Sequence, residues 1–267
     1  MTRTPAGIVF DREGPRGDTP IVFLHAGVAD RRMWEPLWPR VTQARDCARL
    51  DLRGFGESTA PPAGPLDHVS DVLTTLDHQG IGRCHLVGAS FGAGLSVEVA
   101  LTDASRVASL LLCPPGGALL AERTPDLLAF ITAEEEALAR DDLDAAVRAN
   151  VDTWLIGPGR TPDQVDPELV EQVGVMQRRA FEVQASWGEE VDEIELEPPA
   201  LERLGDLACP VLVLLGGHDL LTTHDAARRV VDGAPDVRRV DWPDAAHLPT
   251  LERADQFAAL LQACVDP

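Results

Sequence analysis

Three residues that lie far apart in this 267-residue chain could together activate a hydroxyl group for attack on a carbonyl carbon. Ser90 is the central residue of a Gly-x-Ser-x-Gly pentapeptide that spans residues 88–92. A serine hydroxyl is a weak nucleophile at neutral pH, so it needs a histidine base that a carboxylate orients. Asp219 and His247 follow it in the order nucleophile, acid, base. These residue types in this order indicate acyl transfer.

Two other aspartates compete with Asp219 for the role of the acid. Asp241 falls near the end of the last predicted strand, and Asp244 is close enough to His247 in sequence that we expect it to shape the turn. Asp219 instead follows the preceding strand in a loop of its own. It is therefore the preferred acid.

Acyl transfer also requires two N–H donors for the oxyanion of the tetrahedral intermediate. The first expected donor is the backbone of Phe91, which follows the nucleophile at the start of a predicted helix. Helix N-termini have free N–H groups and favour negative charge. The second donor is expected in the loop after residues 21–24, where Gly27 is preferred and Val28 is the alternative.

The segments around these residues alternate between short apolar runs and helical patterns. Residues 84–88 predict a buried strand, and residues 95–101 predict a helix that packs closely on a sheet. Further strands are predicted at residues 7–11, 21–24, 47–52, 107–113, 210–216 and 237–240. This alternation predicts an α/β fold with a doubly wound, mostly parallel sheet. Ligands bind such sheets at the carboxyl ends of the strands, where the candidate residues lie.

The alternation stops between residues 118 and 205, where apolar residues recur at helical spacing. We expect three or four helices here, inserted as a cap into a core formed by residues 1–117 and 206–267. The acidic runs at residues 134–136, 141–142 and 189–197 are interpreted as solvated helix faces, because no loop has the spacing of a calcium site. The residues expected to line an apolar substrate pocket are Val28, Trp154, Met176, Phe181, Trp187 and Leu248.

Composition excludes several classes of function. The formal net charge of −21 opposes binding to nucleic acid or to an anionic membrane surface. The chain has no lysine and no tyrosine, which excludes a Schiff-base lysine and a phenolic acid. The histidines show no metal-ligand spacing, so we expect no metal and no cofactor. A small-molecule substrate is the expected partner, and the oligomeric state is left open.

The expected location is the cytoplasm. The first six residues lack the apolar run of a signal peptide, and no segment is long enough to cross a membrane. The five cysteines are widely spaced, and four of them lie at or beside predicted strands. They are interpreted as buried thiols in a reducing compartment.

Taken together, the motifs resemble those of the α/β-hydrolase fold. The resemblance rests on His25-Ala26-Gly27 as an oxyanion loop, residues 51–58 as the D-x-R-G-x-G-x-S turn, residues 88–92 as the nucleophile elbow, Gly217-His218-Asp219 as the acid loop and Ala246-His247 as the base loop. It implies a serine hydrolase with a helical cap. Ala26 departs from the glycine that the family usually has there.

The leading functional hypothesis is an esterase or lactonase that acts on a small, largely apolar ester. Serine rather than aspartate at position 90 argues against haloalkane dehalogenases and epoxide hydrolases, which form an alkyl-ester intermediate. Carbon–carbon bond hydrolases, hydroxynitrile lyases and cofactor-free perhydrolases or haloperoxidases use the same constellation and remain alternatives. A ligand-binding receptor on the same scaffold is a third possibility. In such a receptor the catalytic triad would be partly lost or would react slowly.

Overall fold

The structure is a computed structural model, and it describes residues 2–188 and 191–265. Its centre is an eight-stranded sheet with the strand order β1-β2-β4-β3-β5-β6-β7-β8. The strands are β1 (Thr2–Arg3), β2 (Val9–Glu13), β3 (Ile21–Leu24), β4 (Cys47–Leu50), β5 (Cys84–Ser90), β6 (Val107–Pro115), β7 (Val211–Gly216) and β8 (Val237–Trp242). Strand β2 is antiparallel to β1 and β4, and every other pair is parallel. The predicted α/β fold with a mostly parallel sheet is confirmed.

One strand differs in place from its prediction. The run at residues 7–11 was expected to be a short edge strand, but it forms β2 from Val9 to Glu13, and β1 covers its outer side. Strand β1 comprises only Thr2 and Arg3, which is too short to produce a recognisable alternation in the sequence.

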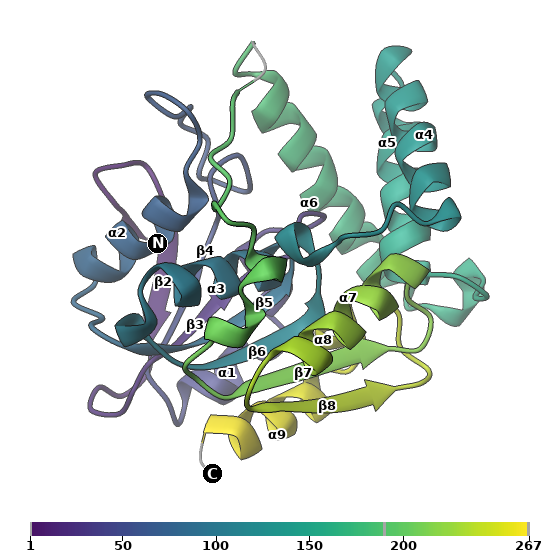
Figure 1. Ribbon diagram of the computed structural model, residues 1–267. Coiled ribbons are helices and arrows are strands. Elements are labelled where there is room, and N and C mark those ends of the chain that lie inside the picture. The colour runs from purple at the N-terminus through teal and green to yellow at the C-terminus, as the bar shows by residue number, and fades with distance from the viewer. Residues whose placement is uncertain (1, 189–190, 266–267) are drawn as a thin grey trace.

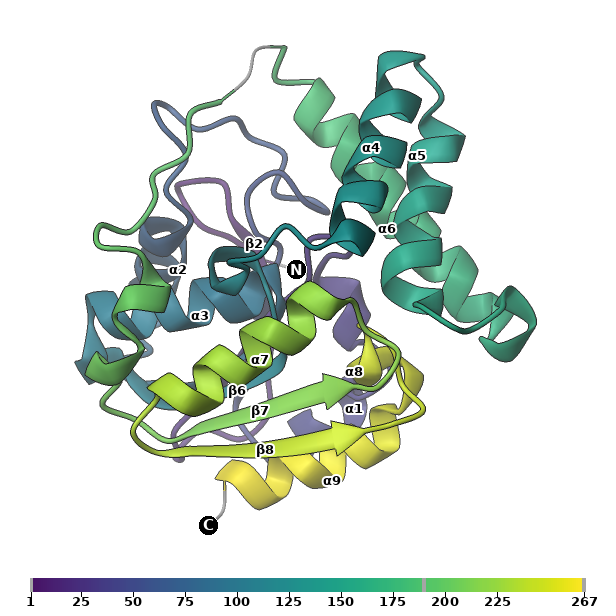
Figure 2. The same cartoon turned by 45° about the vertical axis from the view of Figure 1, so that its right-hand side comes forward.

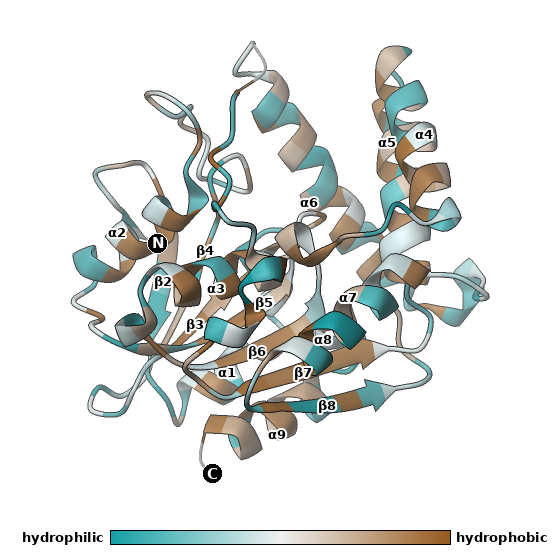
Figure 3. Ribbon diagram, viewed as in Figure 1, coloured by the Kyte–Doolittle hydropathy of each residue, from teal (hydrophilic) through white to brown (hydrophobic). Residues whose placement is uncertain are grey.

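Helices cover both faces of the sheet (Figures 1 and 2). Helices α2 (His68–His78), α3 (Phe91–Thr102) and α7 (Leu221–Gly233) pack on one face, whereas α1 (Trp38–Thr42) and α9 (Ala254–Val265) pack on the other. Successive residues of a strand point to opposite faces, so Val22 and Leu24 of β3 join the first hydrophobic cluster and Ile21 and Phe23 join the second. The central strands are accordingly hydrophobic along their length (Figure 3).

The segment between β6 and β7 contains the helices that were expected to form the cap. They are α4 (Pro125–Ala139), α5 (Leu143–Asn150), a π-helix (Val151–Ile156) and α6 (Pro167–Ala185). In both views α4, α5 and α6 lie together, outside the layers that cover the sheet (Figures 1 and 2). The domain boundaries at residues 118 and 205 stay a prediction. Glu189 and Glu190, in the last acidic run, lie outside the described residues.

Local signals explain where several helices begin and end. The carboxylate of Asp67 caps α2 by accepting a hydrogen bond from the Ser70 N–H at 2.8 Å, as expected for an N-cap aspartate. The last helical stretch of the chain is divided into α8 (Pro249–Glu252) and α9. Arg253 between them is not helical, with φ −139° and ψ 51°.

The cysteines are free thiols, and most of them are buried. Cys47, Cys84, Cys113 and Cys209 are buried free thiols, and Cys264 is half-buried. Burial raises the pKa of Cys47 and of Cys84 to about 12, which keeps both protonated and unreactive. Among the described residues, no helix combines the length and hydrophobicity needed to cross a membrane.

Candidate active site

Ser90 is presented by a sharp turn between β5 and α3. Its backbone has φ 52° and ψ −110°, a strained conformation for a residue with a side chain. The turn also requires very close backbone approaches. A Cβ atom on Gly88 would lie 2.2 Å from the Gly92 carbonyl oxygen, and one on Gly92 would lie 2.4 Å from the Leu24 carbonyl oxygen. The two glycines of the pentapeptide therefore allow the strand, the turn and the helix to pack against β3.

The structure brings Ser90, His247 and Asp219 together. The Ser90 Oγ lies 2.7 Å from Nε2 of His247, and the His247 Nδ1 lies 2.7 and 2.9 Å from the two carboxylate oxygens of Asp219. A carboxylate only accepts hydrogen bonds, so Nδ1 donates to Asp219 and the Nε2 lone pair faces the serine hydroxyl. The side chains of His247 and Asp219 are almost fully buried, which shields their contact from water. In this geometry the imidazole can take the proton from Ser90.

The two competing aspartates lie elsewhere. Asp241 forms an ion pair with Arg239 on strand β8, and Asp244 is an exposed residue 3.6 Å from Arg253. Asp219 is fixed in addition by a hydrogen bond from the Leu220 N–H, at 2.7 Å.

Both residues expected to supply the oxyanion donors, Phe91 and Gly27, line the cavity beside Ser90. Phe91 is the first residue of α3, so its N–H has no acceptor within the helix. Gly27 lies in a turn that is closed by a 3.0 Å hydrogen bond from the Ala29 N–H to the Ala26 carbonyl. A Cβ on Gly27 would lie 3.7 Å from the Cβ of Phe91, so the two backbones are adjacent. Val28 lines the same cavity and stays the alternative.

A cavity of about 290 Å³ opens beside Ser90 and His247. Three of the predicted pocket residues line it: Val28, Trp154 and Phe181. The indole of Trp154 packs against His247, with the ring centres 4.5 Å apart, and belongs to the π-helix that follows α5. The cavity is also lined by the apolar side chains of Phe55, Phe91, Phe130 and Ala180.

The other three predicted pocket residues do not line this cavity. Met176 is buried between the helices of the 118–205 segment, and Leu248 is buried in the core beside His247. Trp187 lines a neighbouring cavity of about 420 Å³ and donates a hydrogen bond from its indole N–H to the Thr59 carbonyl, at 3.0 Å. Helical spacing in the sequence identified buried positions but did not distinguish those that face the serine from those that face another helix.

His25 supports the oxyanion loop and does not touch the candidate nucleophile. Burial lowers its pKa, so the ring is neutral. Its Nε2 accepts a hydrogen bond from the Leu52 N–H at 2.9 Å, which leaves the proton on Nδ1 to be donated to the Ala26 carbonyl at 2.9 Å. The ring thereby joins the 25–27 loop to the 51–58 turn, as expected for a structural histidine.

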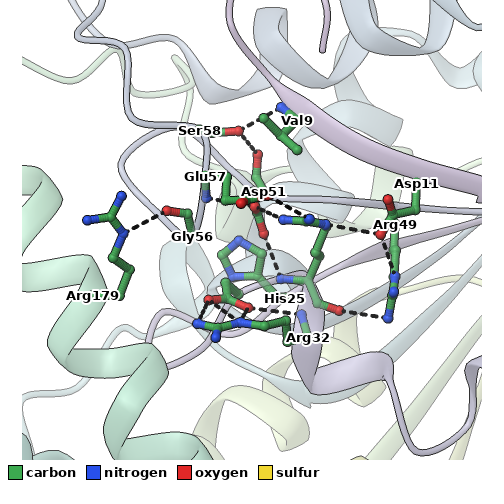
Figure 4. Close-up of polar contacts among 12 residues, drawn as sticks. Val9, Asp11, His25, Arg32, Arg49, Asp51, Gly56, Glu57, Ser58 and Arg179 are labelled. Carbon is green, nitrogen blue, oxygen red and sulfur yellow. Dashed lines mark hydrogen bonds and ion pairs between the residues drawn. The ribbon is translucent and has the colours of Figure 1, made fainter. Parts of the chain in front are cut away.

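The 51–58 turn is held by the buried carboxylate of Asp51 (Figure 4). It accepts hydrogen bonds from the Arg31 N–H at 2.9 Å and the Glu57 N–H at 2.8 Å, and it pairs with the Arg31 guanidinium. Ser58 closes the turn by donating to the Asp51 carbonyl at 2.7 Å. Helix α6 reaches the same turn through Arg179, which donates to the Gly56 carbonyl at 3.1 Å (Figure 4).

Two arginines near the 51–58 turn are held by ion pairs with neighbouring carboxylates. Arg31 forms ion pairs with Asp11, Asp51 and Glu57, and Arg32 pairs with Asp30. Neither lines the cavity beside Ser90.

Four polar residues from helices line this cavity and were not anticipated from the sequence; one of them, Gln184 of α6, is exposed, and the other three are less accessible. Glu134, Asn150 and Gln177 line it, each from a different helix. Glu134 was interpreted as part of a solvated acidic run, but burial raises the pKa of its carboxyl group. A signal was present, because each of the three falls within a helically spaced series of apolar residues. In the described residues, no cluster of three or more His, Cys, Asp and Glu side chains could hold a metal ion.

Comparison with known proteins agrees with this fold. The sequence model of the α/β-hydrolase family matches residues 21–260. The pimeloyl-[acyl-carrier protein] methyl ester esterase of Pectobacterium atrosepticum is 25% identical over 254 residues, which cover 94% of this chain and 96% of the esterase. The match confirms the resemblance inferred from the motifs.

Two further similarities place the chain among larger and structurally known proteins. The dihydrolipoyllysine-residue acetyltransferase component of the acetoin cleaving system of Pseudomonas putida is 29% identical over 245 residues, or 91% of this chain. The chain spans only 62% of that protein's length. The crystal structure of the enol-lactonase from Burkholderia xenovorans LB400 superposes with a TM-score of 0.78 at 22% identity, covering 97% of this chain and 96% of the lactonase. This structural likeness supports the fold.

Proposed function

Because the chain belongs to the α/β-hydrolase family, we propose that it is a serine hydrolase that cleaves a small carboxylic ester or lactone through an acyl-enzyme on Ser90. The observation that carries the proposal is the hydrogen-bonded series from Ser90 through His247 to Asp219, which lies beside a cavity of about 290 Å³. This volume is near the lower end for small-molecule sites, which favours a small substrate.

The proposed reaction has two halves. Ser90 Oγ attacks the carbonyl carbon while His247 Nε2 takes the hydroxyl proton, and the N–H groups of Phe91 and Gly27 stabilise the oxyanion. His247 then gives this proton to the leaving alkoxide as the carbon–oxygen bond breaks. A water molecule then attacks the acyl-enzyme and loses a proton to His247, which passes that proton to Ser90 Oγ as the acyl–oxygen bond breaks and the acid is released. Asp219 orients the imidazole and stabilises its positive charge in both halves.

The comparisons favour ester chemistry over the alternatives on the same residues. One relative that matches almost end to end is named as a methyl ester esterase, and one similar solved structure is an enol-lactonase. The acetyltransferase component extends beyond the part that this chain matches, so its named activity does not bear on the choice among these reactions.

The test is a series of p-nitrophenyl esters from acetate to octanoate, with a set of simple lactones, assayed on the wild type and on Ser90→Ala. We expect turnover that the variant loses, and wild-type labelling by a fluorophosphonate that is likewise lost. Labelling without ester or lactone turnover would favour a carbon–carbon bond hydrolase, a lyase or a perhydrolase. The absence of both turnover and labelling would refute the proposal and favour a binding protein.

A further inference from the structure

The cavity beside Ser90 has one polar wall among its apolar ones. Glu134 of α4, Asn150 of α5 and Gln177 of α6 form it, and all three helices pack together in the 118–205 segment (Figures 1 and 2). A cavity that bound only hydrocarbon would gain from apolar side chains at these positions, because a buried polar group without a partner costs free energy. The polar wall therefore needs an explanation.

Asn150 uses its amide hydrogens within the protein. Its side chain is buried, and its Nδ2 donates to the Glu134 Oε1 at 2.5 Å and to the Ala146 carbonyl at 3.0 Å. An amide nitrogen has two hydrogens, so no donor is left for a ligand. The effect of Asn150 is to hold the Glu134 carboxyl group against the cavity.

Gln177 is a buried glutamine whose amide oxygen is unpaired in the described part of the chain. The residue is only 5% exposed, and among the described residues its Oε1 has no hydrogen-bond partner. Buried side-chain amides in proteins are almost always paired, and unpaired ones indicate a missing partner. Because Gln177 lines the cavity with Ser90 and His247, a bound substrate can supply that partner.

We propose that the substrate carries a hydrogen-bond donor, a hydroxyl or an amide N–H, that binds between the Gln177 amide oxygen and the Glu134 carboxyl group. The inference rests on the proposed function of Ser90 and names its substrate class: a small ester or lactone with a polar, donor-bearing substituent rather than a plain alkyl chain. It revises the largely apolar ester expected from the sequence. Gln177 and Glu134 are specificity residues and take no part in the bond-breaking step.

The test compares pairs of substrates that differ in a single group of nearly equal size. On the acyl side, the p-nitrophenyl esters of 3-hydroxybutanoate and 3-methylbutanoate exchange a hydroxyl for a methyl group. Those of N-acetylglycine and 4-oxopentanoate exchange an amide N–H for a methylene. On the alcohol side, 2-hydroxyethyl acetate is compared with propyl acetate. The three pairs distinguish a hydroxyl from an amide donor and the acyl side from the alcohol side.

We expect the wild type to prefer the donor-bearing member of at least one pair by about tenfold or more in kcat/KM, because a site built to bind a donor rejects the analogue that lacks one. Gln177→Leu should abolish that preference, so that the ratio of kcat/KM between the two members of the pair falls to about one. Glu134→Gln tests the second partner, and should reduce the preference. Gln184→Leu is the matched control: this glutamine lies on the same helix and lines the same cavity but is exposed, so the preference should persist.

Two results would overturn the inference, and they are distinguishable. Turnover that depends on Ser90 but shows no preference within any pair would refute the donor-binding role and leave the proposed function intact. Absence of turnover for every ester, together with absence of fluorophosphonate labelling, would refute the proposed function and this inference with it. The wild-type measurements suffice for both, so a variant that fails to fold does not block the test.

Discussion

Gly116 follows strand β6, and because it has no side chain it leaves room for Ser90. An ideal Cβ at this position would lie 2.8 Å from both the Cα and the Oγ of Ser90. The backbone of Gly116 is fully extended, with φ −167° and ψ −162°, so alanine would fit the conformation and only its methyl group would clash. Gly116→Ala therefore tests whether the position of the Ser90 side chain determines activity.

The size of the effect follows from these distances. Ordinary Cβ contacts begin at 3.4 Å, so Ser90 or the end of β6 must move by about 0.6 Å. If Ser90 moves, its Oγ contact with His247 lengthens from 2.7 Å to more than 3 Å, beyond the usual range for a hydroxyl donor. Misplacement of a reacting group by about 1 Å can cost about 100-fold, so we expect kcat/KM to fall about 10- to 100-fold, or about 1.4 to 2.7 kcal/mol in the barrier.

The assay measures kcat/KM with p-nitrophenyl butanoate together with the rate of fluorophosphonate labelling, since both depend on the reactivity of Ser90. Gly82→Ala is the control, because nothing lies within 4 Å of a Cβ at that position. Thermal unfolding of both variants separates a loss of activity from a loss of fold. Values of kcat/KM and of the labelling rate within twofold of the wild type would show that the site absorbs the methyl group, and would refute the reasoning.

Three further predictions concern the acid and two buried titratable groups. Asp219→Asn should lower kcat by about 10³- to 10⁴-fold with little change in KM, because His247 loses the acceptor that fixes its tautomer; a loss under tenfold in steady-state kinetics would refute this role. Burial lowers the pKa of His68 to about 4, so the folded state favours its neutral form and loses up to about 3 kcal/mol of stability as the pH falls from 6.5 to 4. His68→Phe should show a smaller loss in urea unfolding at pH 7 and pH 4, and an unchanged loss would contradict the assignment. Burial, with neighbouring carboxylates, raises the pKa of Glu98 to about 7, so stability should fall as the pH rises from 4.5 to 7, by about 1 kcal/mol given its partial exposure. Glu98→Gln should flatten that slope in the same assay, and an unchanged slope would assign it to other groups.

The core of the fold could be predicted because its signals are local. Apolar runs bounded by turn residues predict buried strands. The strand, turn and helix around Ser90 are formed by consecutive residues, so one short stretch of sequence predicts all three. Parallel strands end at the same edge of a sheet, which is why Asp219 and His247, 28 residues apart, could be expected near Ser90. The short edge strand at Thr2 and Arg3 and the break at Arg253 were missed, since neither is long enough to leave a periodic pattern.

The substrate cavity was harder to predict because it depends on how helices cross. Helical spacing shows which side of a helix is buried, but a residue on that side can face a neighbouring helix, as Met176 does, or the serine, as Phe181 does. Only the packing angle of the helix decides between these, and that angle is set by contacts distant in sequence.

The polar wall nevertheless left a pattern in the sequence that apolar lining residues do not. Asn150 falls among Val147, Val151 and Trp154, and Gln177 among Val173, Met176 and Ala180, so both occupy the buried face of their helix. A polar side chain on that face must find a partner in the protein or in a ligand. The amide nitrogen of Asn150 donates to two acceptors within the protein, whereas the amide oxygen of Gln177 has no donor among the described residues. An amide oxygen without a donor, in the wall of a cavity that also contains the candidate nucleophile, is therefore a stronger indication of what the substrate carries than any of the aromatic residues around it.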